Sequence, residues 1–410
     1  MRACFISPEY PPRMFGGLGS HVEQLSEALG KHIALDIVLP SHRPGYQDPP
    51  HSRIRLIPLT RSDPSYSLPN SWLDFALEAA DKIDNMVMGG ASFNVIHCHD
   101  WVTVLAGVRC RWRHNIPLVF HMHLPSSSPL EAAIESLGLS CADVVTVNSD
   151  SMRVQLLHRS RILDFELDWV KVINNGVDLA IFHPREDWPA DDGYILFAGH
   201  LEQHKGPECL LRAFYYVQSE FPDIRLRILG DGDLWSHLHE LRVSLEIPER
   251  QVEFIRTAQW LTRQEMARHF QGARVVVIPS LYEAFGMVAI EALACQRPVV
   301  VSNTGGLAQI VKHYVNGFLA APRDELDLAQ WIMVMLADSE LRHRMGVEGR
   351  RRLHDEYTWP NIARQFMALY RDLQQPRTRD IPLQAYEFKA QIEELAGRGY
   401  ADLFDWGWRP

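Results

Sequence analysis

The chain has 410 residues and a formal net charge of −10 at neutral pH, and 46% of its residues are hydrophobic against 22% that are charged. This composition is typical of a soluble globular protein, and the length predicts two domains because a single core rarely grows so large. The acidic balance argues against a protein that binds nucleic acid.

Signals for membrane insertion and secretion are weak. No apolar run reaches the roughly 18 residues that a membrane-spanning helix needs, and no clear basic amphipathic helix supports peripheral contact with a membrane. The apolar run Ala3–Ile6 stops before Pro8, which favours a strand over a signal peptide. The six cysteines form no C-x-x-C pair and suit a reducing compartment. We therefore expect a cytoplasmic protein.

The first half of the chain alternates short apolar runs with amphipathic segments. In Leu18–Leu29, apolar residues recur on one face at helical spacing. Such alternation of strands and helices predicts a parallel sheet covered on both faces. The predicted helices are Leu18–Leu29, Ser71–Met88 and Thr103–Trp112, and the predicted strands are Ala3–Ser7, Ala34–Leu39, Ile54–Leu59, Val95–His99, Leu118–His121, Val144–Asn148 and Val170–Ile173.

A segment rich in proline and acidic residues, Phe182–Gly193, is predicted to be a linker. A second series of strands and helices follows it, and a helical candidate, Ala385–Ala396, lies near the end of the chain before the aromatic-rich Phe404–Trp408. The second series has predicted helices at Pro207–Glu220, after the turn Gly230–Gly232, and at Ala289–Ala294, with strands at Tyr194–Ala198, Arg225–Leu229, Val252–Ile255, Val275–Ile278, Pro298–Ser302 and Phe318–Ala320.

The most informative stretch is Pro279–Gln309, which carries Glu283 and Glu291 eight residues apart. Gly286 lies before the predicted helix and lets the backbone approach a ligand closely. Backbone N–H groups at the start of a helix bind anions such as a diphosphate. A carboxylate beside such amides is what a nucleotide-sugar site needs. Taken singly, Glu283 could be a helix-dipole contact and Glu291 a solvated helix residue.

The whole stretch closely resembles the donor-site signature of the retaining glycosyltransferases of family 4, the group that includes bacterial glycogen and starch synthases. The resemblance covers about residues 1–373, with further family marks at Asn175–Asp178 and Tyr357–Trp359. It implies the GT-B fold, an α/β architecture of two Rossmann-like domains that face each other across a cleft. The implied parts are an acceptor-binding domain over 1–183, a nucleotide-sugar-binding domain over 193–358, and C-terminal helices over 359–410 that pack back on the first domain.

The resemblance also assigns roles to residues of this stretch. Glu283 is expected to be catalytic, through contacts with the hydroxyls of the transferred sugar. The backbone at Gly286, Met287 and Val288 is expected to bind the diphosphate, and Glu291 the ribose hydroxyls.

The loop Gly199–Gly206 resembles the family pattern G-R-L-x-x-x-K-G, in which the arginine and the lysine neutralise the diphosphate. Lys205 matches the lysine and is expected to serve both donor binding and catalysis. His200 replaces the arginine, and a histidine offers fewer donors and a charge that depends on pH. Two further departures are Gln309, where the family usually has glutamate, and Arg256, at a site that is often glycine.

The glycine-rich loop Phe15–Gly19 lies between the first predicted strand and helix. Glycines there let backbone N–H groups face a phosphate, and Gly16 and Gly17 are expected to bind the donor. The loop resembles the G-G-x-G-x-H of family 4. It is not G-x-G-x-x-G, so a dinucleotide-binding fingerprint is disfavoured.

Two H-x-H pairs, at 97–99 and 121–123, end neighbouring predicted strands. Side chains at the carboxyl edge of a parallel sheet point into a binding crevice. By resemblance, His121 matches the pocket histidine that contacts the donor sugar and is expected to be catalytic. The H-D-W of glycogen synthases is matched by the expected acceptor-binding residues His99, Asp100 and Trp101, with the loop Pro125–Leu130 nearby.

Two alternatives stay open for these histidines. Each could be an ordinary core residue, and H-x-H pairs on strands also have the spacing of metal ligands. A metal site is disfavoured because nothing else in the chain resembles a metalloenzyme, and we expect no metal.

These features predict a metal-independent retaining glycosyltransferase that moves a hexosyl group, with glucosyl the best guess, from a nucleotide sugar to a sugar or glycan. No cofactor is expected, since the UDP- or ADP-linked sugar is a substrate. The departures at His200, Arg256 and Gln309 leave open a non-catalytic protein that binds nucleotide sugars, and a GT-B nucleotide-sugar epimerase is a further alternative.

Overall fold

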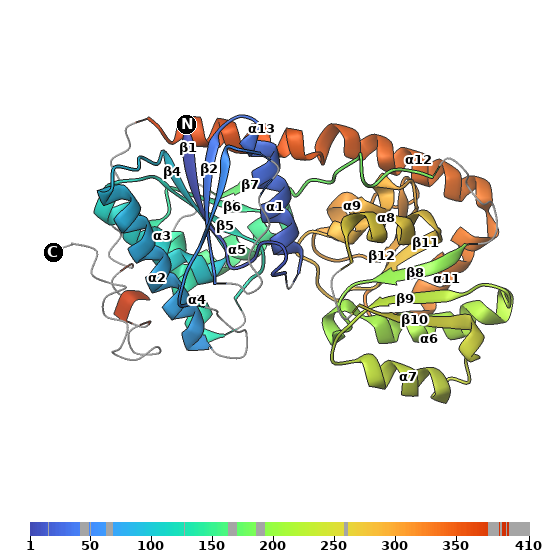
Figure 1. The fold of residues 1–410 in the computed structure, drawn as a ribbon. Helices are drawn as coiled ribbons and strands as arrows, with labels where there is room; N and C mark the ends of the chain where they lie inside the picture. The colour runs from blue at the N-terminus through green and yellow to red at the C-terminus, as the bar shows by residue number, and fades with distance from the viewer. Residues whose placement is uncertain are drawn as a thin grey trace. The chain divides into compact units, whose positions relative to one another are not determined.

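A computed structural model of the chain describes residues 1–375 other than 15, 42–48, 50, 63–68, 127, 163–169, 186–192 and 258–260, together with 385, 388–390 and 392. The chain forms two compact units (Figure 1). The first comprises Met1–Asn148, Met152–Ile173 and the chain from Ile362 onward, and the second comprises Ser149–Ser151 and Asn174–Asn361.

The first unit is built on a parallel sheet whose described strands run in the order β3-β2-β1-β4-β5-β6-β7. Most strand residues are buried on both faces of the sheet, as expected where helices cover a parallel sheet. The strands are β1 (Arg2–Ile6), β2 (Ala34–Leu39), β3 (Ile54–Pro58), β4 (Val95–His99), β5 (Leu118–Met122), β6 (Val144–Val147) and β7 (Val170–Val172).

Successive residues of β4 face different helices. The Sγ of Cys98 lies 3.3 Å from a carbonyl oxygen of α3, and α3 packs against α2 and α4 (Figure 1). His97 and His99 point to the opposite face, where the ring of His97 meets Tyr370 of α13. The helices that contribute to this unit are α1 (Gly17–Gly30), α2 (Pro69–Met88), α3 (Trp101–His114), α4 (Pro129–Cys141), α5 (Asp150–Ile162) and α13 (Trp359–Asp372).

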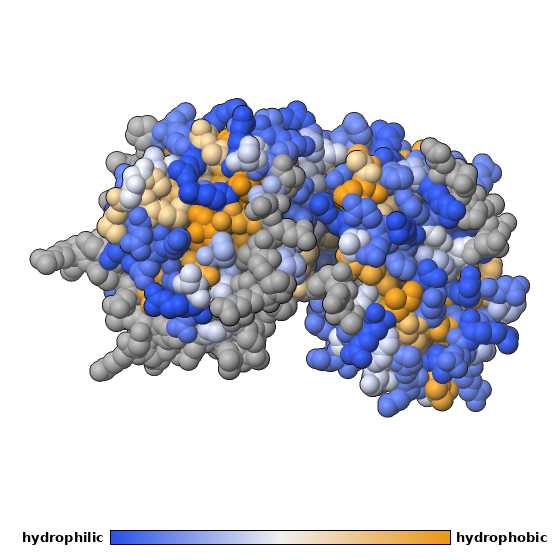
Figure 2. Space-filling model, viewed as in Figure 1, coloured by the Kyte–Doolittle hydropathy of each residue, from blue (hydrophilic) through white to orange (hydrophobic). Residues whose placement is uncertain are grey.

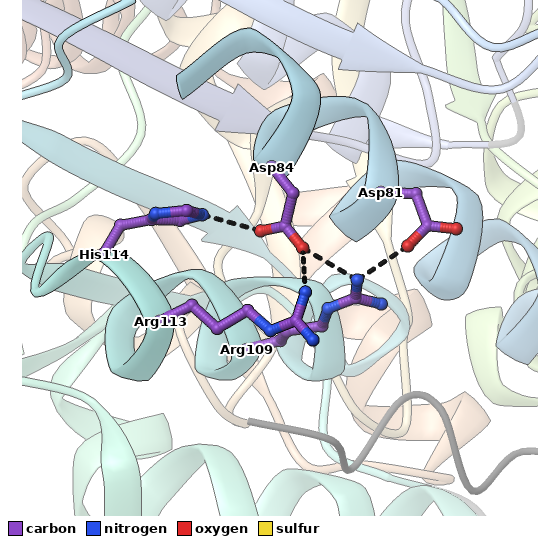
Figure 3. A network of polar contacts seen from close by, with 5 residues as sticks. All are labelled: Asp81, Asp84, Arg109, Arg113 and His114. Atoms are coloured by element: carbon purple, nitrogen blue, oxygen red, sulfur yellow. Dashed lines mark hydrogen bonds and ion pairs between the residues drawn. The ribbon is translucent and has the colours of Figure 1, made fainter. Parts of the chain in front are cut away.

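A polar network joins α2 to α3 (Figure 3). The buried carboxylate of Asp84 lies 2.7 Å from each of Arg109, Arg113 and His114, and Arg109 also pairs with the half-exposed Asp81 at 2.7 Å. Burial raises the pKa of Asp84, but the hydrogen bond from His114 and the charges of the two arginines outweigh it and hold that pKa below its usual value.

The second unit is built on another parallel sheet, and its described strands run in the order β10-β9-β8-β11-β12-β13. Alternate residues of β8 enter two separate cores, because Ile195 packs toward α6, α7 and α11 whereas Leu196 packs toward α8, α9 and α12. The strands are β8 (Tyr194–Ala198), β9 (Leu226–Gly230), β10 (Val252–Arg256), β11 (Ala273–Ile278), β12 (Val299–Ser302) and β13 (Gly317–Ala320). The helices are α6 (Pro207–Glu220), α7 (Trp235–Ser244), α8 (Arg263–Gln271), α9 (Met287–Ala294), α10 (Leu307–Ile310), α11 (Glu325–Ala337) and α12 (Ser339–Glu356), with short 3-10 turns at Gln203–Lys205 and Glu249–Gln251.

Several predicted boundaries need correction. The chain enters the second unit at Asn174, before the predicted limit at 183. Phe182 is not part of a linker, because its side chain is 1% exposed in the core of the second unit. The predicted acceptor loop Pro125–Leu130 runs into α4 at Pro129, and α4 and α5 were not predicted at all. The described residues of the tail candidate, 385, 388–390 and 392, are helical, whereas Phe15 and Phe404–Trp408 lie outside the described residues.

The surface in view is mostly hydrophilic, with smaller hydrophobic areas on each unit (Figure 2). Among the described helices, none combines the length and the apolar character that crossing a lipid bilayer requires. All six cysteines are free thiols. A cytoplasmic location stays a prediction.

Candidate functional site

In the second unit, Glu283 lies on the loop that joins β11 to α9. Lys205 Nζ donates a hydrogen bond to Glu283 Oε2 at 2.8 Å, and Ser280 Oγ donates to the same oxygen at 3.3 Å. The side chains of Lys205 and Glu283 are 23% and 17% exposed, so the ion pair is accessible to a ligand and yet partly shielded from water. The loop follows the carboxyl end of a parallel strand, where α/β proteins bind their ligands.

The backbone around this ion pair is held by main-chain contacts. Leu281 N donates to His204 O at 2.7 Å, which ties the loop of Glu283 to the 3-10 turn that carries Lys205. Gly306 N donates to Glu283 O at 2.8 Å. Gly305 adopts a φ of +49°, and a Cβ atom there would collide with Glu283 O, so the Gly-Gly turn can approach the loop only without a side chain.

The start of α9 lies directly after this loop. Gly286 precedes it with a φ of +118°, and among the described residues no side chain caps the helix and no acidic residue occupies its first turn. Helical bonding begins with the N–H of Ala289, which donates to Gly286 O at 3.0 Å. The amides of Met287 and Val288 therefore lie at the positive end of the helix dipole, where an anion is stabilised.

Glu291 lies one helical turn after Met287 on α9. Positions four residues apart share a helix face, so the side chain of Glu291 lies on the same face as that of Met287. Loss of hydration raises the pKa of Glu291 to about 8, although the charge of Arg263 acts in the opposite direction. A protonated carboxyl both donates and accepts hydrogen bonds, which suits contacts with hydroxyl groups.

His200 lies on the loop after β8, near the carboxylate of Asp231, which pairs with Arg256, another departure from the family pattern. Arg256 Nε lies 3.0 Å from both carboxylate oxygens of Asp231, so Arg256 closes an ion pair at the end of β9. This hydrogen bond from Arg256 holds the pKa of Asp231 below its usual value. His200 itself is partly buried.

Sequence reasoning missed Ser149 and Asp150, which belong to the second unit. Ser149 Oγ donates to Ala284 O at 2.6 Å, beside Glu283. Asp150 N donates to Gln309 Oε1 at 2.9 Å, and Gln309 Nε2 donates back to Asp150 Oδ2 at 2.7 Å. A glutamate at 309 would place its carboxylate against that of Asp150, and the two charges would repel each other. The amide of glutamine can instead donate a hydrogen bond to Asp150. In the sequence, only the unusual Gln309 pointed to the contact with Asp150.

In the first unit, the two H-x-H pairs gather with a further histidine. His99 pairs in register with His121 across β4 and β5, and His123 follows β5. His21, on α1, covers them, with ring centroids 4.8 Å from His121 and 4.6 Å from His123. The side chains of His21, His99 and His121 are 0% exposed and that of His123 is 6% exposed.

Burial decides the charge of these rings. It lowers the pKa of His97, His99, His121 and His123 well below the usual value, and the neighbouring imidazoles lower it further. The four rings are therefore neutral at physiological pH. Within the cluster, His99 Nδ1 lies 3.2 Å from His123 Nε2.

The predicted acceptor residues surround this cluster. Asp100 Oδ1 accepts hydrogen bonds from the backbone N–H of His123 at 2.7 Å and of Leu124 at 3.3 Å. Burial raises the pKa of Asp100 to about 7, and these two bonds act against that rise. Trp101 opens α3 and is partly exposed.

The glycine-rich loop leads directly into α1. Gly16 is the residue before the helix, with no capping side chain among the described residues, and Gly17 is its first residue. Gly19 N donates to Glu9 Oε2 at 3.2 Å. Predicted site residues therefore fall into two groups on separate units. The second unit brings together Lys205, Glu283, Gly286, Met287, Val288 and Glu291, with His200 on a neighbouring loop, and the first unit carries Gly16, Gly17, His99, Asp100, Trp101 and His121.

Known proteins match both halves of the chain. The family model described as Glycosyltransferase Family 4 matches residues 15–181, and the one described as Glycosyl transferases group 1 matches residues 180–352. An uncharacterised glycosyltransferase of Methanocaldococcus jannaschii is 31% identical over 90% of this chain and 98% of its own length. The alpha-maltose-1-phosphate synthase of Mycolicibacterium smegmatis is 28% identical over 90% of this chain and 99% of its own. The solved sucrose-phosphate synthase of Thermosynechococcus elongatus is similar with a TM-score of 0.77 and 25% identity, over 91% of this chain and 98% of its own.

Proposed function

Because this chain belongs to family 4 of the glycosyltransferases and has their GT-B fold, we propose that it moves a hexosyl group, glucosyl in the first instance, from a UDP- or ADP-linked sugar to a sugar or glycan acceptor with retention of the anomeric configuration. The relatives support a disaccharide-like product, since the mycolicibacterial protein is named for α-maltose 1-phosphate and the solved structure for sucrose phosphate.

One observation carries this proposal: the Lys205–Glu283 ion pair lies beside the start of α9, which no side chain caps in the described part of the chain. Breaking the bond between the anomeric carbon and the diphosphate builds negative charge on the leaving group and positive charge on the sugar. Lys205 and the amides of Met287 and Val288 offer the positive end of such a site. Glu283, held by Lys205 and Ser280, offers a carboxylate for the sugar hydroxyls.

The raised pKa of Glu291 supports its predicted contact with the ribose. A neutral carboxyl near a diphosphate adds no repulsion, whereas an ionised one would. On the first unit, contacts of His121 with the donor sugar and of His99, Asp100 and Trp101 with the acceptor stay predictions.

A donor screen tests the proposal. The full chain should be stabilised against thermal unfolding by one nucleotide sugar in a panel of UDP-, ADP- and GDP-linked hexoses, because a ligand that binds only the folded state raises its melting temperature. Incubation of that donor, isotopically labelled in the sugar, with glucose, maltose and their phosphates should then give a labelled glycoside. A labelled epimer of the donor, or donor binding without any product across the acceptor panel, would contradict glycosyl transfer by this site.

A further inference from the structure

The loop that carries Glu283 is held by residues that are far away in the sequence. Residues 279–286 join β11 to α9, and we call them the Glu283 loop. Ser149 Oγ donates to Ala284 O at 2.6 Å, and the side chain of Ser149 is completely buried. The peptide group that carries this oxygen joins Ala284 to Phe285, directly after Glu283. Ser149 thus fixes the orientation of the main chain on one side of the proposed catalytic carboxylate.

A second set of contacts orients Ser149. Asp150 opens α5, and its backbone N–H donates to Gln309 Oε1 at 2.9 Å. Gln309 Nε2 donates back to Asp150 Oδ2 at 2.7 Å. Two hydrogen bonds between the same residues restrain their direction as well as their distance, whereas a single bond leaves rotation free. The pair of Asp150 and Gln309 therefore fixes the main chain next to Ser149.

Gln309 is in turn tied to the Glu283 loop. It lies on the short α10, which follows the Gly305-Gly306 turn, and its N–H donates to Gly306 O at 3.1 Å. The N–H of Gly306 donates to Glu283 O at 2.8 Å. These contacts close a ring of residues that all belong to the second unit: Glu283, Gly306, Gln309, Asp150, Ser149 and Ala284.

Gly286 makes such a restraint necessary. Its φ of +118° lies in a region that glycine enters freely, so this residue does not itself fix the angle between the Glu283 loop and α9. The two carbonyl groups of Glu283 and Ala284 are each held by a hydrogen bond from the ring. Holding two consecutive peptide planes determines the path of the main chain, because each residue has only two soft dihedral angles. The ring therefore sets the position from which the side chain of Glu283 extends.

We propose that Ser149, Asp150 and Gln309 are positioning residues of the glycosyl-transfer site, which hold Glu283 where the transferred sugar requires it. This inference rests on the proposed function, because it takes Glu283 as the catalytic carboxylate. Catalysis depends so steeply on geometry that a displacement of about 1 Å can lower the rate by about 100-fold. The three side chains therefore contribute to turnover although they act only through the main chain of the Glu283 loop.

Turnover and donor affinity should respond differently to loss of the ring, because the groups proposed to hold the diphosphate are not members of it. Ser149→Ala should lower kcat by about 10- to 100-fold, while the dissociation constant of the donor, measured by calorimetry, changes by less than about threefold. Ser140→Ala is the matched control, since Ser140 Oγ is also buried and donates to a backbone carbonyl, that of Ser136 on α4. This control should leave both quantities at their wild-type values.

Exchanging the charge between positions 150 and 309 tests the second set of contacts. Gln309→Glu introduces the usual residue of the family but places a carboxylate against Asp150, so kcat should fall by about tenfold or more. Asp150→Asn keeps a neutral acceptor for Gln309 and should cost about threefold. In the double variant Asp150→Asn/Gln309→Glu, the new amide can donate to the new carboxylate, and kcat should return to within about threefold of wild type. A general loss of stability would not be reversed by a second substitution.

Hydrogen exchange of the full chain measures the positioning without reference to transfer. The N–H groups of Leu281 and Gly306 hold the Glu283 loop through backbone oxygens, so peptides that contain them report its order. In Ser149→Ala and Gln309→Glu these amides should exchange about tenfold faster than in wild type, and the double variant should exchange nearly as slowly as wild type. A wild-type chain without turnover would remove the proposed function, and the exchange rates would still decide whether the ring holds the loop. Unchanged exchange in both single variants, or faster exchange with unaffected kcat, would overturn the proposal.

Discussion

Glu283 combines a modest structural role with a proposed catalytic one. Its ion pair with Lys205 is partly exposed, and such pairs contribute about 0–1 kcal/mol to stability. Glu283→Gln should therefore leave the free energy of unfolding within about 1 kcal/mol of wild type. Turnover should fall by about 100-fold or more, as when one preorganised polar group is removed from a transition-state site.

The control for this substitution lies on the same side of the second unit. Glu202 pairs with His204 on the loop of Lys205, and both side chains are 48% exposed. Glu202→Gln removes the same charge and should leave turnover within a factor of about two. Parallel kinetics and urea unfolding of the two variants provide the comparison, and near-wild-type turnover in Glu283→Gln would remove Glu283 from the reaction.

Glu291 makes a separate prediction about pH. Its pKa rises from an ordinary 4.5 to about 8 on folding, so the folded chain holds the proton more tightly than the unfolded chain. The free energy of unfolding contributed by this carboxyl is therefore highest below pH 4.5 and falls as the pH rises toward 8. Glu291→Gln lacks this loss and should gain stability over wild type with rising pH, by a few kcal/mol at most.

Urea unfolding of wild type and Glu291→Gln between pH 5 and 8.5, without ligand, measures this difference. Glu220→Gln, at an exposed end of α6, controls for the change in net charge. A stability difference between wild type and Glu291→Gln that stays constant across this range would show that the carboxyl is hydrated in the folded chain.

At the scale of elements, the network between α2 and α3 should dominate the electrostatic stability of the first unit. Asp84 is 5% exposed and binds Arg109, Arg113 and His114, so Asp84→Asn leaves the charge of the buried Arg109 uncompensated and should cost about 3 kcal/mol. Because the folded pKa of Asp84 is lowered, this contribution is present above its ordinary pKa of 3.8 and is lost as the pH falls through the folded value.

Asp81→Asn is the matched control on the same helix. Asp81 is 51% exposed and pairs only with Arg109 among the described residues, so its loss should cost about 1 kcal/mol or less. Thermal and urea unfolding at pH 7 should rank the variants in this order, and at low pH wild type and Asp84→Asn should converge. Equal losses of stability in Asp84→Asn and Asp81→Asn would mean that burial does not strengthen the ion pairs of this network.

The sequence predicted some elements to the residue, and for one of them local signals mark the start. β2, β4, β8 and α6 match their predicted limits to the residue, and α6 is marked by Gly206 before it and Pro207 at its first position. α4 had comparable signals in Ser128, whose side chain caps the helix, and Pro129. Among its described side chains, the polar α5 buries few apolar ones, so its periodicity was too weak to show.

Site residues could be predicted only as far as their local chemistry allowed. The carboxylate before α9 and the lysine of the preceding loop were visible as motifs, but their ion pair joins positions 205 and 283, and no local pattern encodes it. The same holds for Gln309 with Asp150 and for His21 with the two H-x-H pairs. These contacts depend on strand register and on which helix covers which face of a sheet.

For the whole molecule, the outcome of the reaction follows from the groups that surround the proposed donor site. Lys205 and the amides at the start of α9 offset the charge of the diphosphate, and Arg256 already engages Asp231 of the Asp231-Gly232-Asp233 sequence. We expect transfer with retention of the anomeric configuration and without added Mg²⁺ or Mn²⁺. The leaving phosphate would accept the proton of the acceptor hydroxyl on the same face of the sugar.

NMR of the product formed from an α-linked donor should show an α-glycoside. Activity should persist in chelator-treated protein to which no divalent ion has been restored. A β-linked product, or a strict requirement for Mg²⁺ or Mn²⁺ under these conditions, would exclude this mechanism.

The path of the chain between its two units also determines the order in which they can fold. The second unit is complete in sequence once Asn361 has been synthesised, whereas the first still lacks Phe366 and Tyr370 of α13, which cover His97. A nascent chain thus presents the first sheet with His97 not yet covered by α13, although α1 already covers the neighbouring His121, while the other unit can already close. We expect the first unit to complete its folding only after α13 has left the ribosome, although β1 emerges long before that helix.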